Sequence, residues 1–173
     1  LPAAHKEKVR EPVWKLSKCS AGITVRFLSN STSISVKWAL LYDEFMSHMA
    51  MTGIKGIDLY ILNKNEWQYV NTGFPRQKSN EAKLIQNMSS EWREFKLFLP
   101  LYDGVTDLEV GIDKGSSIKK TAPKSEKPIV FYGTSITQGG CASRPGMAHT
   151  NIISRKLKRD VLNFGFSGNG RME

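Results

Sequence analysis

The stretch Ile129-Val-Phe-Tyr-Gly-Thr-Ser-Ile-Thr-Gln-Gly139 decides the fold of the C-terminal part of the chain. Its first four residues are all apolar, which is typical of a strand buried on both faces of a parallel sheet. A glycine-rich turn follows, and apolar residues then recur at helical spacing over about 148–159. A second apolar run, Val161-Leu-Asn-Phe164, predicts another buried strand. This order of strand, turn, helix and strand predicts the opening β-α-β unit of a parallel α/β sheet.

A single crossover unit is too small to make a complete α/β domain. Two parallel strands and one helix cannot bury both faces of a sheet. We therefore expect residues 129–173 to be only the N-terminal portion of a larger α/β domain.

The region upstream, residues 12–113, has the pattern of an all-β domain. Apolar residues alternate with polar ones in several short segments separated by turn signals, at 23–27, 34–38, 57–61, 95–99 and 108–112. The first two of these segments flank the turn-rich Ser29-Asn-Ser-Thr32 and are predicted to pair as a hairpin. No helical stripe is evident in this region. Many short strands with regular turns predict a β-sandwich of jelly-roll type.

The segment Gly115–Pro128 is polar, basic and contains proline, which is typical of a connector between domains. The predicted organisation is a β-sandwich at 1–114, a linker at 115–128 and the first part of the α/β domain at 129–173.

Composition limits the classes of partner. The 173 residues carry a formal net charge of +9 and 40% hydrophobic residues, as expected for a folded globular protein that attracts anions. The cations are scattered along the chain, so we do not expect nucleic-acid binding. No apolar run approaches the roughly 20 residues that span a bilayer. Cys19 and Cys141 are far apart and lack the spacing of a disulfide framework or a metal site. No metal and no organic cofactor is expected.

The N-terminus, Leu-Pro-Ala-Ala-His, lacks an initiator Met and a hydrophobic signal region. It is consistent with the mature end of an exported protein or with a boundary of the expressed segment. Export to the periplasm or the cell exterior is therefore an expectation.

Ser135 is the candidate nucleophile. A serine hydroxyl becomes reactive when it is exposed beside a base, with donors aimed at the developing oxyanion. The carboxyl end of a parallel strand provides that exposure, and Ser135 directly follows the strand, Gly133 and Thr134. The alternative is a turn serine that caps a helix.

A second glycine-rich loop, Asn163-Phe-Gly-Phe-Ser-Gly-Asn-Gly170, follows the second predicted strand. Because carboxyl ends of parallel strands share one edge of a sheet, its backbone N–H groups can face the pocket of Ser135.

These motifs resemble those of a known family. Gly133-Thr-Ser135 and Asn163-x-Gly-x-Ser-Gly168 look like the first two blocks of the SGNH/GDSL hydrolases. Gly56-Ile-Asp-Leu-Tyr60 matches the signature of the GxDLY β-domain that precedes such a hydrolase domain in bacterial proteins. The β-domain resemblance covers roughly residues 10–120 and the hydrolase resemblance roughly 127–173.

The resemblance implies a three-layer α/β hydrolase domain in which Ser135 is the nucleophile and its own N–H is one oxyanion donor. Gly168 would be the second donor, and Asn169 could reach the pocket. The family commonly has Asp before the serine, where this chain has Thr134. Its later blocks, with the Asn donor and the Asp and His of the triad, are expected beyond Glu173.

For several other residues, a structural role is set against a catalytic or binding role. His149 is favoured as a first-turn helix residue over a base, and His48 as a partly buried loop residue that could line a shared cleft. Asp58 is predicted to make a buried structural hydrogen bond. The tryptophans suggest sugar stacking, but core positions are the default for most of them, namely Trp14, Trp38, Trp67 and Trp92.

The expected function is a serine carboxylic-ester hydrolase of the SGNH/GDSL type that deacylates a carbohydrate ester, with a catalytic domain that is incomplete in this chain. Two alternatives stay open. One is a glycan-binding β-sandwich with a vestigial α/β segment, and the other is an acyltransferase that uses the same serine. The oligomeric state is not predicted.

Overall fold

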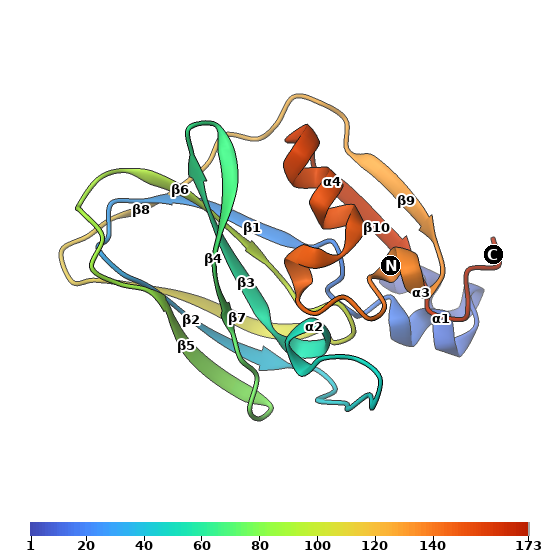
Figure 1. The fold of residues 1–173 in the computed structure, drawn as a ribbon. Helices are drawn as coiled ribbons and strands as arrows, with labels where there is room; N and C mark the ends of the chain where they lie inside the picture. The colour runs from blue at the N-terminus through green and yellow to red at the C-terminus, as the bar shows by residue number, and fades with distance from the viewer. Residues whose placement is uncertain (173) are drawn as a thin grey trace.

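Two antiparallel sheets form the N-terminal part of the computed structural model, which describes residues 1–172 (Figure 1). One sheet has the strand order β4-β3-β6-β1-β8, with β1 (Thr24–Ser29), β3 (Ile57–Asn63), β4 (Glu66–Gly73), β6 (Arg93–Phe98) and β8 (Ile118–Lys120). The other has the order β5-β2-β7, with β2 (Ile34–Leu40), β5 (Ser79–Ile85) and β7 (Val105–Ile112).

The core of this sandwich lies between the two sheets. Its fully buried side chains come from alternate positions of strands in both sheets, among them Val36, Trp38, Leu59, Phe95 and Leu97. The period-two pattern thus marked most of the core-facing side chains, although Ile23 of the first segment is 52% exposed. The antiparallel sandwich is confirmed.

The predicted hairpin is wrong. β1 pairs with β6 and β8 in one sheet, whereas β2 pairs with β5 and β7 in the other. The segment between them crosses from sheet to sheet, and Asp113 accepts hydrogen bonds from Ser31, Thr32 and Ser33 across the crossing. These hydroxyl donors, Ser33 foremost, lower the pKa of Asp113 below its usual value. A half-buried strand has the same alternation whether its partner is its sequence neighbour or a distant strand.

Short helices interrupt the region predicted to be all-β. They are η1 (Ala3–Lys8), α1 (Glu11–Leu16) and α2 (Met51–Lys55). Each spans two turns or fewer, which is too short for a helical stripe. Within the predicted linker, β8 pairs with β1, so this stretch adds a strand to the sandwich.

The β-α-β unit is confirmed. It comprises β9 (Ile129–Gly133), α3 (Ser135–Gln138), η2 (Pro145–Met147), α4 (His149–Leu157) and β10 (Val161–Gly165). β9 and β10 pair in parallel, with Phe131 opposite Asn163. The expectation of burial on both faces is wrong here, because Val130 is 59% and Leu162 is 45% exposed. Phe131, on the other face, packs edge-on against His149 of α4. Val130, Tyr132 and Leu162 on the opposite face are each at least 40% exposed.

The motif residue Asp58 joins the two parts of the chain. Its carboxylate is fully buried on β3 and accepts hydrogen bonds of 2.8 Å from both the Arg144 guanidinium and the Gly146 N–H. It also accepts a 2.6 Å hydrogen bond from the Thr72 hydroxyl, and Arg144 donates to the Tyr60 hydroxyl at 2.7 Å. The predicted structural role of Asp58 is confirmed, and its partners place the loop that leads into α4.

Replacing Asp58 with alanine is expected to lower the free energy of unfolding by about 3–5 kcal/mol, because Arg144 and the Gly146 N–H lose their buried acceptor. Urea unfolding of the full-length protein measures the change. The matched control is Lys37→Ala, which breaks a pair that is 56% and 64% exposed and should cost less than about 1 kcal/mol. An Asp58→Ala variant as stable as this control would contradict the role assigned to Asp58.

Cations alternate with aromatic rings across the outer face of the five-stranded sheet, where the segment 144–158 packs on it. We call this contact the junction. Its closest stacks, measured from the cation to the ring centroid, are Arg144 over Tyr69 at 3.8 Å, Arg155 over Tyr60 at 4.3 Å and Lys96 over Trp67 at 4.6 Å. Such stacking stabilises cations that are removed from water.

Lys96 is the junction cation that is buried without a hydrogen-bond partner. Its side chain is 0% exposed, and its ammonium has no hydrogen-bond partner among residues 1–172. Burial, followed by Lys124 and Arg26, lowers its pKa from 10.5 to about 8. The folded protein therefore releases this proton at a lower pH than the unfolded chain does.

Replacing Lys96 with methionine is expected to raise the free energy of unfolding at pH 7 by about 1–3 kcal/mol, because a buried unpaired charge is removed. Between the folded pKa of about 8 and the unfolded value of 10.5, the unfolded chain binds more protons, so wild-type stability rises with pH. The advantage of the variant should therefore shrink between pH 7 and pH 10. Urea unfolding at the two pH values measures it, and a constant difference would contradict the buried-charge account.

Candidate active site

Ser135 is the first residue of α3 and lies two residues after the end of β9. Its backbone is firmly held. The Ser135 carbonyl accepts hydrogen bonds from the N–H groups of Gly139 at 3.0 Å and Gly140 at 2.7 Å, and from the Tyr102 hydroxyl at 3.3 Å. Burial is the main cause that raises the pKa of Tyr102, so this hydroxyl stays protonated and can donate. A residue of the β-sandwich thus helps to position the nucleophile turn.

The Ser135 side chain is half-buried, and its hydroxyl makes no hydrogen bond within the part of the chain that the structure describes. No histidine of residues 1–172 is hydrogen-bonded to it. The hydroxyl is held at a strand-to-helix turn and remains available to a substrate and to a base.

The second strand approaches the nucleophile turn closely. A Cβ atom on Gly165 would lie 2.1 Å from the backbone nitrogen of Gln138, so only glycine fits at the end of β10. The parallel pairing then extends beyond the strands, since the Phe166 N–H donates to the Gly133 carbonyl at 2.9 Å. The loop 166–170 is therefore anchored beside the end of β9, as the shared sheet edge predicts.

Gly168 lies in this loop with a φ of +70° and open space where a Cβ would stand. Within residues 1–172, its N–H and that of Ser135 have no hydrogen-bond acceptor. A developing oxyanion requires N–H groups that are free to donate to it. Their joint role as oxyanion donors stays a prediction.

Gln138 was not found by the sequence reasoning. It is 0% exposed, its amide donates to the Leu101 carbonyl at 3.1 Å, and its oxygen accepts the Ser167 N–H at 2.9 Å. This one side chain ties α3 to the loop of Gly168 and to the β-sandwich. A glutamine in a four-residue helix carries no sequence signal for such a role.

Asn163 makes a similar link. Its amide donates to the Thr137 carbonyl at 2.7 Å and its oxygen accepts the Gly165 N–H at 2.8 Å. This asparagine of the second motif therefore joins β10 to the nucleophile turn.

Asn169 lines a cavity of about 330 Å³, together with Tyr102, Ser167 and residues of α1 and the loop before α2. Its side-chain oxygen accepts a 2.8 Å hydrogen bond from Arg10, and its amide donates to the Ser167 carbonyl. The residue lies next to Gly168, but these partners hold its side chain. Its contact with a substrate stays a prediction.

His149 and His48 lie in different surroundings. His149 is the first residue of α4, as expected of a first-turn residue, with its ring 5.8 Å from that of Phe131. His48 is exposed, so the expectation of partial burial is wrong. The Cys141 thiol lies 3.7 Å from the His48 carbonyl, which brings this loop beside the segment that follows α3. A role for the His48 imidazole in a shared cleft stays a prediction.

The tryptophans are mostly not in the core, contrary to expectation. Trp38 is 2% exposed, whereas Trp92 is 46% exposed, and Trp14 and Trp67 are half-buried. Trp92 immediately precedes β6, and Trp67 lies near the β3–β4 turn, where packing between the sheets does not reach.

No helix of residues 1–172 is both long and apolar enough to cross a bilayer. Nor does that part of the chain hold a group of three or more His, Cys, Asp or Glu that could bind a metal ion. Both Cys19 and Cys141 are free thiols.

Comparison with known proteins yields two family matches in sequence. The GxDLY model, described as the N-terminus of SGNH-hydrolase-type esterases, matches residues 1–118. The model of the GDSL-like lipase/acylhydrolase family matches residues 126–173. No curated protein matches the chain significantly.

Solved structures have the same arrangement of the two parts. A protein from Bacteroides ovatus ATCC 8483, assigned as a GDSL-like lipase, is 38% identical with a TM-score of 0.94, over 98% of this chain and 50% of its own. A salicylyl-acyltransferase from a tetracycline biosynthetic pathway is 14% identical with a TM-score of 0.72, over 98% and 46%. A family two carbohydrate esterase from Clostridium thermocellum, solved with cellohexaose, is 15% identical with a TM-score of 0.61, over 87% and 46%.

The chain spans about half the length of each of these three structures. The first family model alone covers more than half of the chain, and the second continues almost directly after it. The chain therefore belongs to the SGNH-hydrolase-type esterases, of which it comprises the GxDLY N-terminal domain and part of the GDSL-like lipase/acylhydrolase domain.

Proposed function

We propose that the full-length protein is a serine ester hydrolase that removes an acyl group from a carbohydrate through an acyl-enzyme on Ser135. The observation that carries the proposal is the partner-free Ser135 hydroxyl at the strand-to-helix turn after β9, at the sheet edge where Phe166 anchors the loop of Gly168 to Gly133. Membership of the esterase family supports the reaction class. The fold likeness to a carbohydrate esterase supports the substrate class.

In the proposed reaction, the Ser135 oxygen attacks the acyl carbonyl carbon and its proton passes to a general base. The N–H groups of Ser135 and Gly168 stabilise the negative charge that develops on the carbonyl oxygen. The carbon–oxygen bond to the sugar then breaks, and the sugar oxygen takes the proton. Water attacks the acyl-enzyme in the same way and releases the acid and the free serine. By family resemblance, the base and its orienting acid lie beyond Glu173.

The test is acetate release from an acetylated xylo-oligosaccharide by the full-length protein, with p-nitrophenyl acetate and a long-chain p-nitrophenyl ester as comparisons. The proposal expects kcat/KM to be highest for the acetylated sugar. A clear preference for the long-chain ester would indicate a lipase and contradict the carbohydrate assignment. Binding of the sugar without acid release from any ester would favour the glycan-binding alternative.

Acyl transfer is the second candidate, because the chain shares its fold with a salicylyl-acyltransferase. Both reactions use the same acyl-enzyme and differ only in the acceptor that resolves it. Product analysis with a sugar alcohol added to the assay separates them. Hydrolysis predicts free acid at acceptor concentrations where a transferase forms mainly the new ester.

A further inference from the structure

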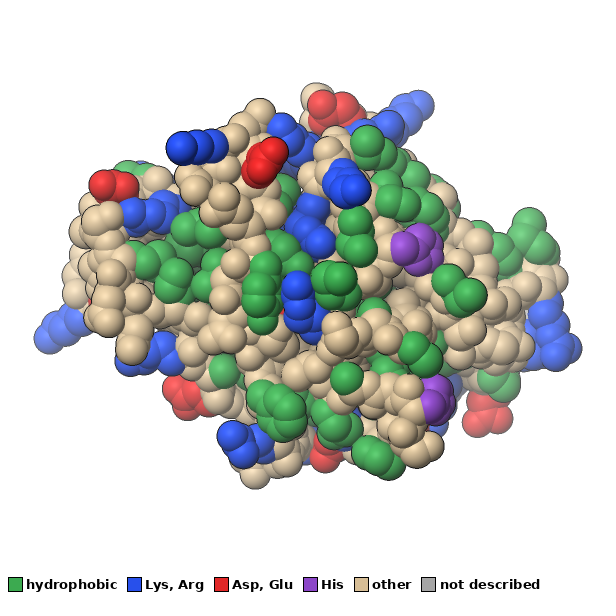
Figure 2. Space-filling model, viewed as in Figure 1, with side chains coloured by type: hydrophobic (Ala, Val, Ile, Leu, Met, Phe, Trp, Pro, Cys, Tyr) green, Lys and Arg blue, Asp and Glu red, His purple; other side chains and the backbone are tan. Residues whose placement is uncertain are grey.

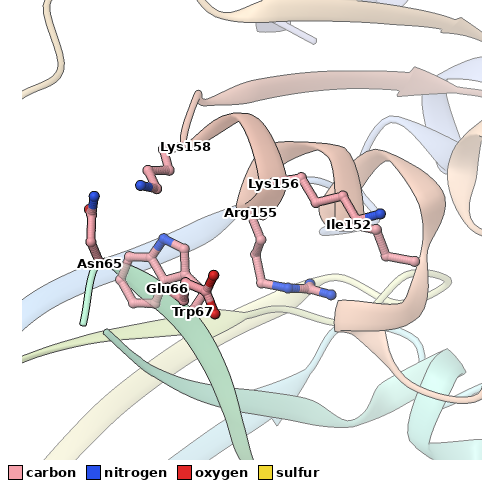
Figure 3. A pocket seen from close by; sticks show the side chains of 7 residues that line it. All are labelled: Asn65, Glu66, Trp67, Ile152, Arg155, Lys156 and Lys158. Carbon is pink, nitrogen blue, oxygen red and sulfur yellow. The ribbon is translucent and has the colours of Figure 1, made fainter. Parts of the chain in front are cut away.

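A second cleft opens between the β3–β4 turn and α4, with a volume of about 470 Å³ (Figure 3). The turn contributes Glu66 and Trp67, and the helix end contributes Arg155, Lys156 and Lys158. Figure 3 shows the Lys158 side chain extending from the end of α4 toward the turn that carries Trp67. The β3–β4 turn forms one wall of the cleft and the end of α4 forms the other. The cleft therefore exists only where the sandwich meets the α/β segment.

The cleft is distinct from the candidate active site. Lys158 follows α4 and precedes the amino end of β10, whereas Ser135 follows the carboxyl end of β9. Because β9 and β10 are parallel and in register, these ends lie at opposite edges of the two-stranded sheet. A molecule in this cleft would therefore leave Ser135 open.

Positive charge dominates the cleft. Arg155, Lys156 and Lys158 face one acidic residue, Glu66, and none of the three cations pairs with a carboxylate of residues 1–172. Figure 2 shows Lys and Arg side chains along the line where α4 meets the sandwich. Exposed cations without internal counter-ions attract an anion from solution.

A buried cation next to Trp67 adds to the positive charge of the cleft. The ammonium of Lys96 lies 4.6 Å from the centroid of the Trp67 ring and has no hydrogen-bond partner in the described chain. Lys124 and Arg26 act on it as further positive charges, and Asp160 and Glu94 act on it as negative ones. Charge removed from water is normally paired, so the Lys96 ammonium, which has no hydrogen-bond partner in the described chain, adds positive potential beside Trp67.

Trp67 gives the cleft a flat apolar surface. Its ring is half-buried, so part of it remains accessible. A sugar ring can lie on an indole face, and a carboxylate matches the ammonium groups of Lys156 and Lys158. The chemistry of the cleft therefore suits a ligand that combines a pyranose ring with a carboxylate.

We propose that this cleft binds a carboxylate-bearing saccharide and holds an acidic polysaccharide on the protein while Ser135 cleaves an ester elsewhere on it. The charge and the aromatic surface argue for the ligand class, and its part in catalysis rests on the proposed function. Lys156 and Lys158 supply the exposed charge and Trp67 the stacking surface. The Arg155 guanidinium, which donates to the Gly146 carbonyl at 2.6 Å, adds fixed positive charge to the wall.

Isothermal titration of the full-length protein with trigalacturonate, compared with neutral xylotriose, tests the proposal. We expect trigalacturonate to bind, more weakly as salt increases, and xylotriose to bind at least tenfold more weakly. The Lys156→Gln/Lys158→Gln double variant changes exposed side chains and should lose at least tenfold in affinity for trigalacturonate. Trp67→Ala should weaken binding as well.

The chain offers a matched control, because Lys119 lies 4.1 Å from the centroid of the Trp92 ring at a surface away from the cleft. Lys119→Gln and Trp92→Ala should leave trigalacturonate binding unchanged. Equal binding of xylotriose, or full affinity in the double lysine variant, would overturn the proposal. Tighter binding of inorganic polyphosphate or single-stranded DNA would overturn it in favour of a phosphate site.

Performing the titration in a Ser135→Ala background separates this proposal from the esterase proposal. If trigalacturonate binds but the wild type hydrolyses no ester, the cleft proposal is supported and the esterase proposal is wrong. If the wild type hydrolyses esters but does not bind trigalacturonate, the esterase proposal is supported and the cleft proposal is wrong.

Discussion

Replacing Ser135 with alanine in the full-length protein is expected to lower kcat for ester hydrolysis by about ten-thousand-fold or more. The variant cannot form the acyl-enzyme, and any remaining rate comes from substrate binding and the oxyanion donors. The Ser135 backbone should stay in place, because its carbonyl bonds to Gly139, Gly140 and Tyr102 do not involve the side chain. KM should therefore change little. Initial rates of p-nitrophenyl acetate hydrolysis over a substrate series measure both parameters.

The matched control is Ser143→Ala, an exposed serine in the segment that follows the nucleophile turn. It should retain wild-type kcat. If Ser135→Ala keeps more than about a tenth of wild-type kcat while Ser143→Ala is unchanged, another residue is the nucleophile. Loss in both variants would point to damage of the loop rather than to chemistry.

Replacing Gln138 with leucine is expected to lower kcat by about a hundredfold or more, the typical effect of losing one oxyanion donor. Leucine fills a similar volume but leaves the Ser167 N–H and the Leu101 carbonyl without their partner. The loop that carries Gly168 then loses its attachment to α3. Because each buried polar group left unpaired also costs about 1–3 kcal/mol, the free energy of unfolding should fall as well.

The conservative variant Gln138→Glu separates positioning from stability. A glutamate carboxylate can still accept the Ser167 N–H but cannot donate to the Leu101 carbonyl. It should therefore restore much of kcat while remaining less stable than wild type. If both variants lose stability equally and neither loses kcat, Gln138 has no positioning role.

The sequence predicted the elements that local pattern determines. The apolar run before Gly133 predicted β9 and the helical spacing predicted α4, because a strand-turn-helix unit places its signals within a few residues. The alternation of β2 and β6 likewise identified Trp38 and Phe95 as core residues.

Pairing and exposure were less predictable, because they depend on distant residues. Alternation in β1 and β2 did not show that the two strands belong to different sheets, since each has one apolar row in either arrangement. Val130 lies in an apolar run but is 59% exposed, because burial depends on what packs against its face and not on the run itself. Trp92 has the composition of a core residue but lies before β6 at the rim of the sheet.

The same division holds at the candidate site. Ser135 and Gly168 could be singled out because short motifs of the chain carry them. Gln138 and Tyr102 could not, because their contacts with the loop at Ser167 and with Ser135 exist only after the sandwich and the α/β segment have packed together. The strand position of Asp58 predicted a structural role. Its partners in the loop 144–146 could not be predicted, because they are distant in sequence.

The central claim is that Ser135 is the nucleophile, and covalent labelling of the full-length protein with a fluorophosphonate tests it most directly. Mass spectrometry of the intact protein and of its peptides is the measurement. We predict a single adduct that maps to Ser135, and no adduct in the Ser135→Ala variant. An adduct on a different residue, or labelling that persists in Ser135→Ala, would contradict the account.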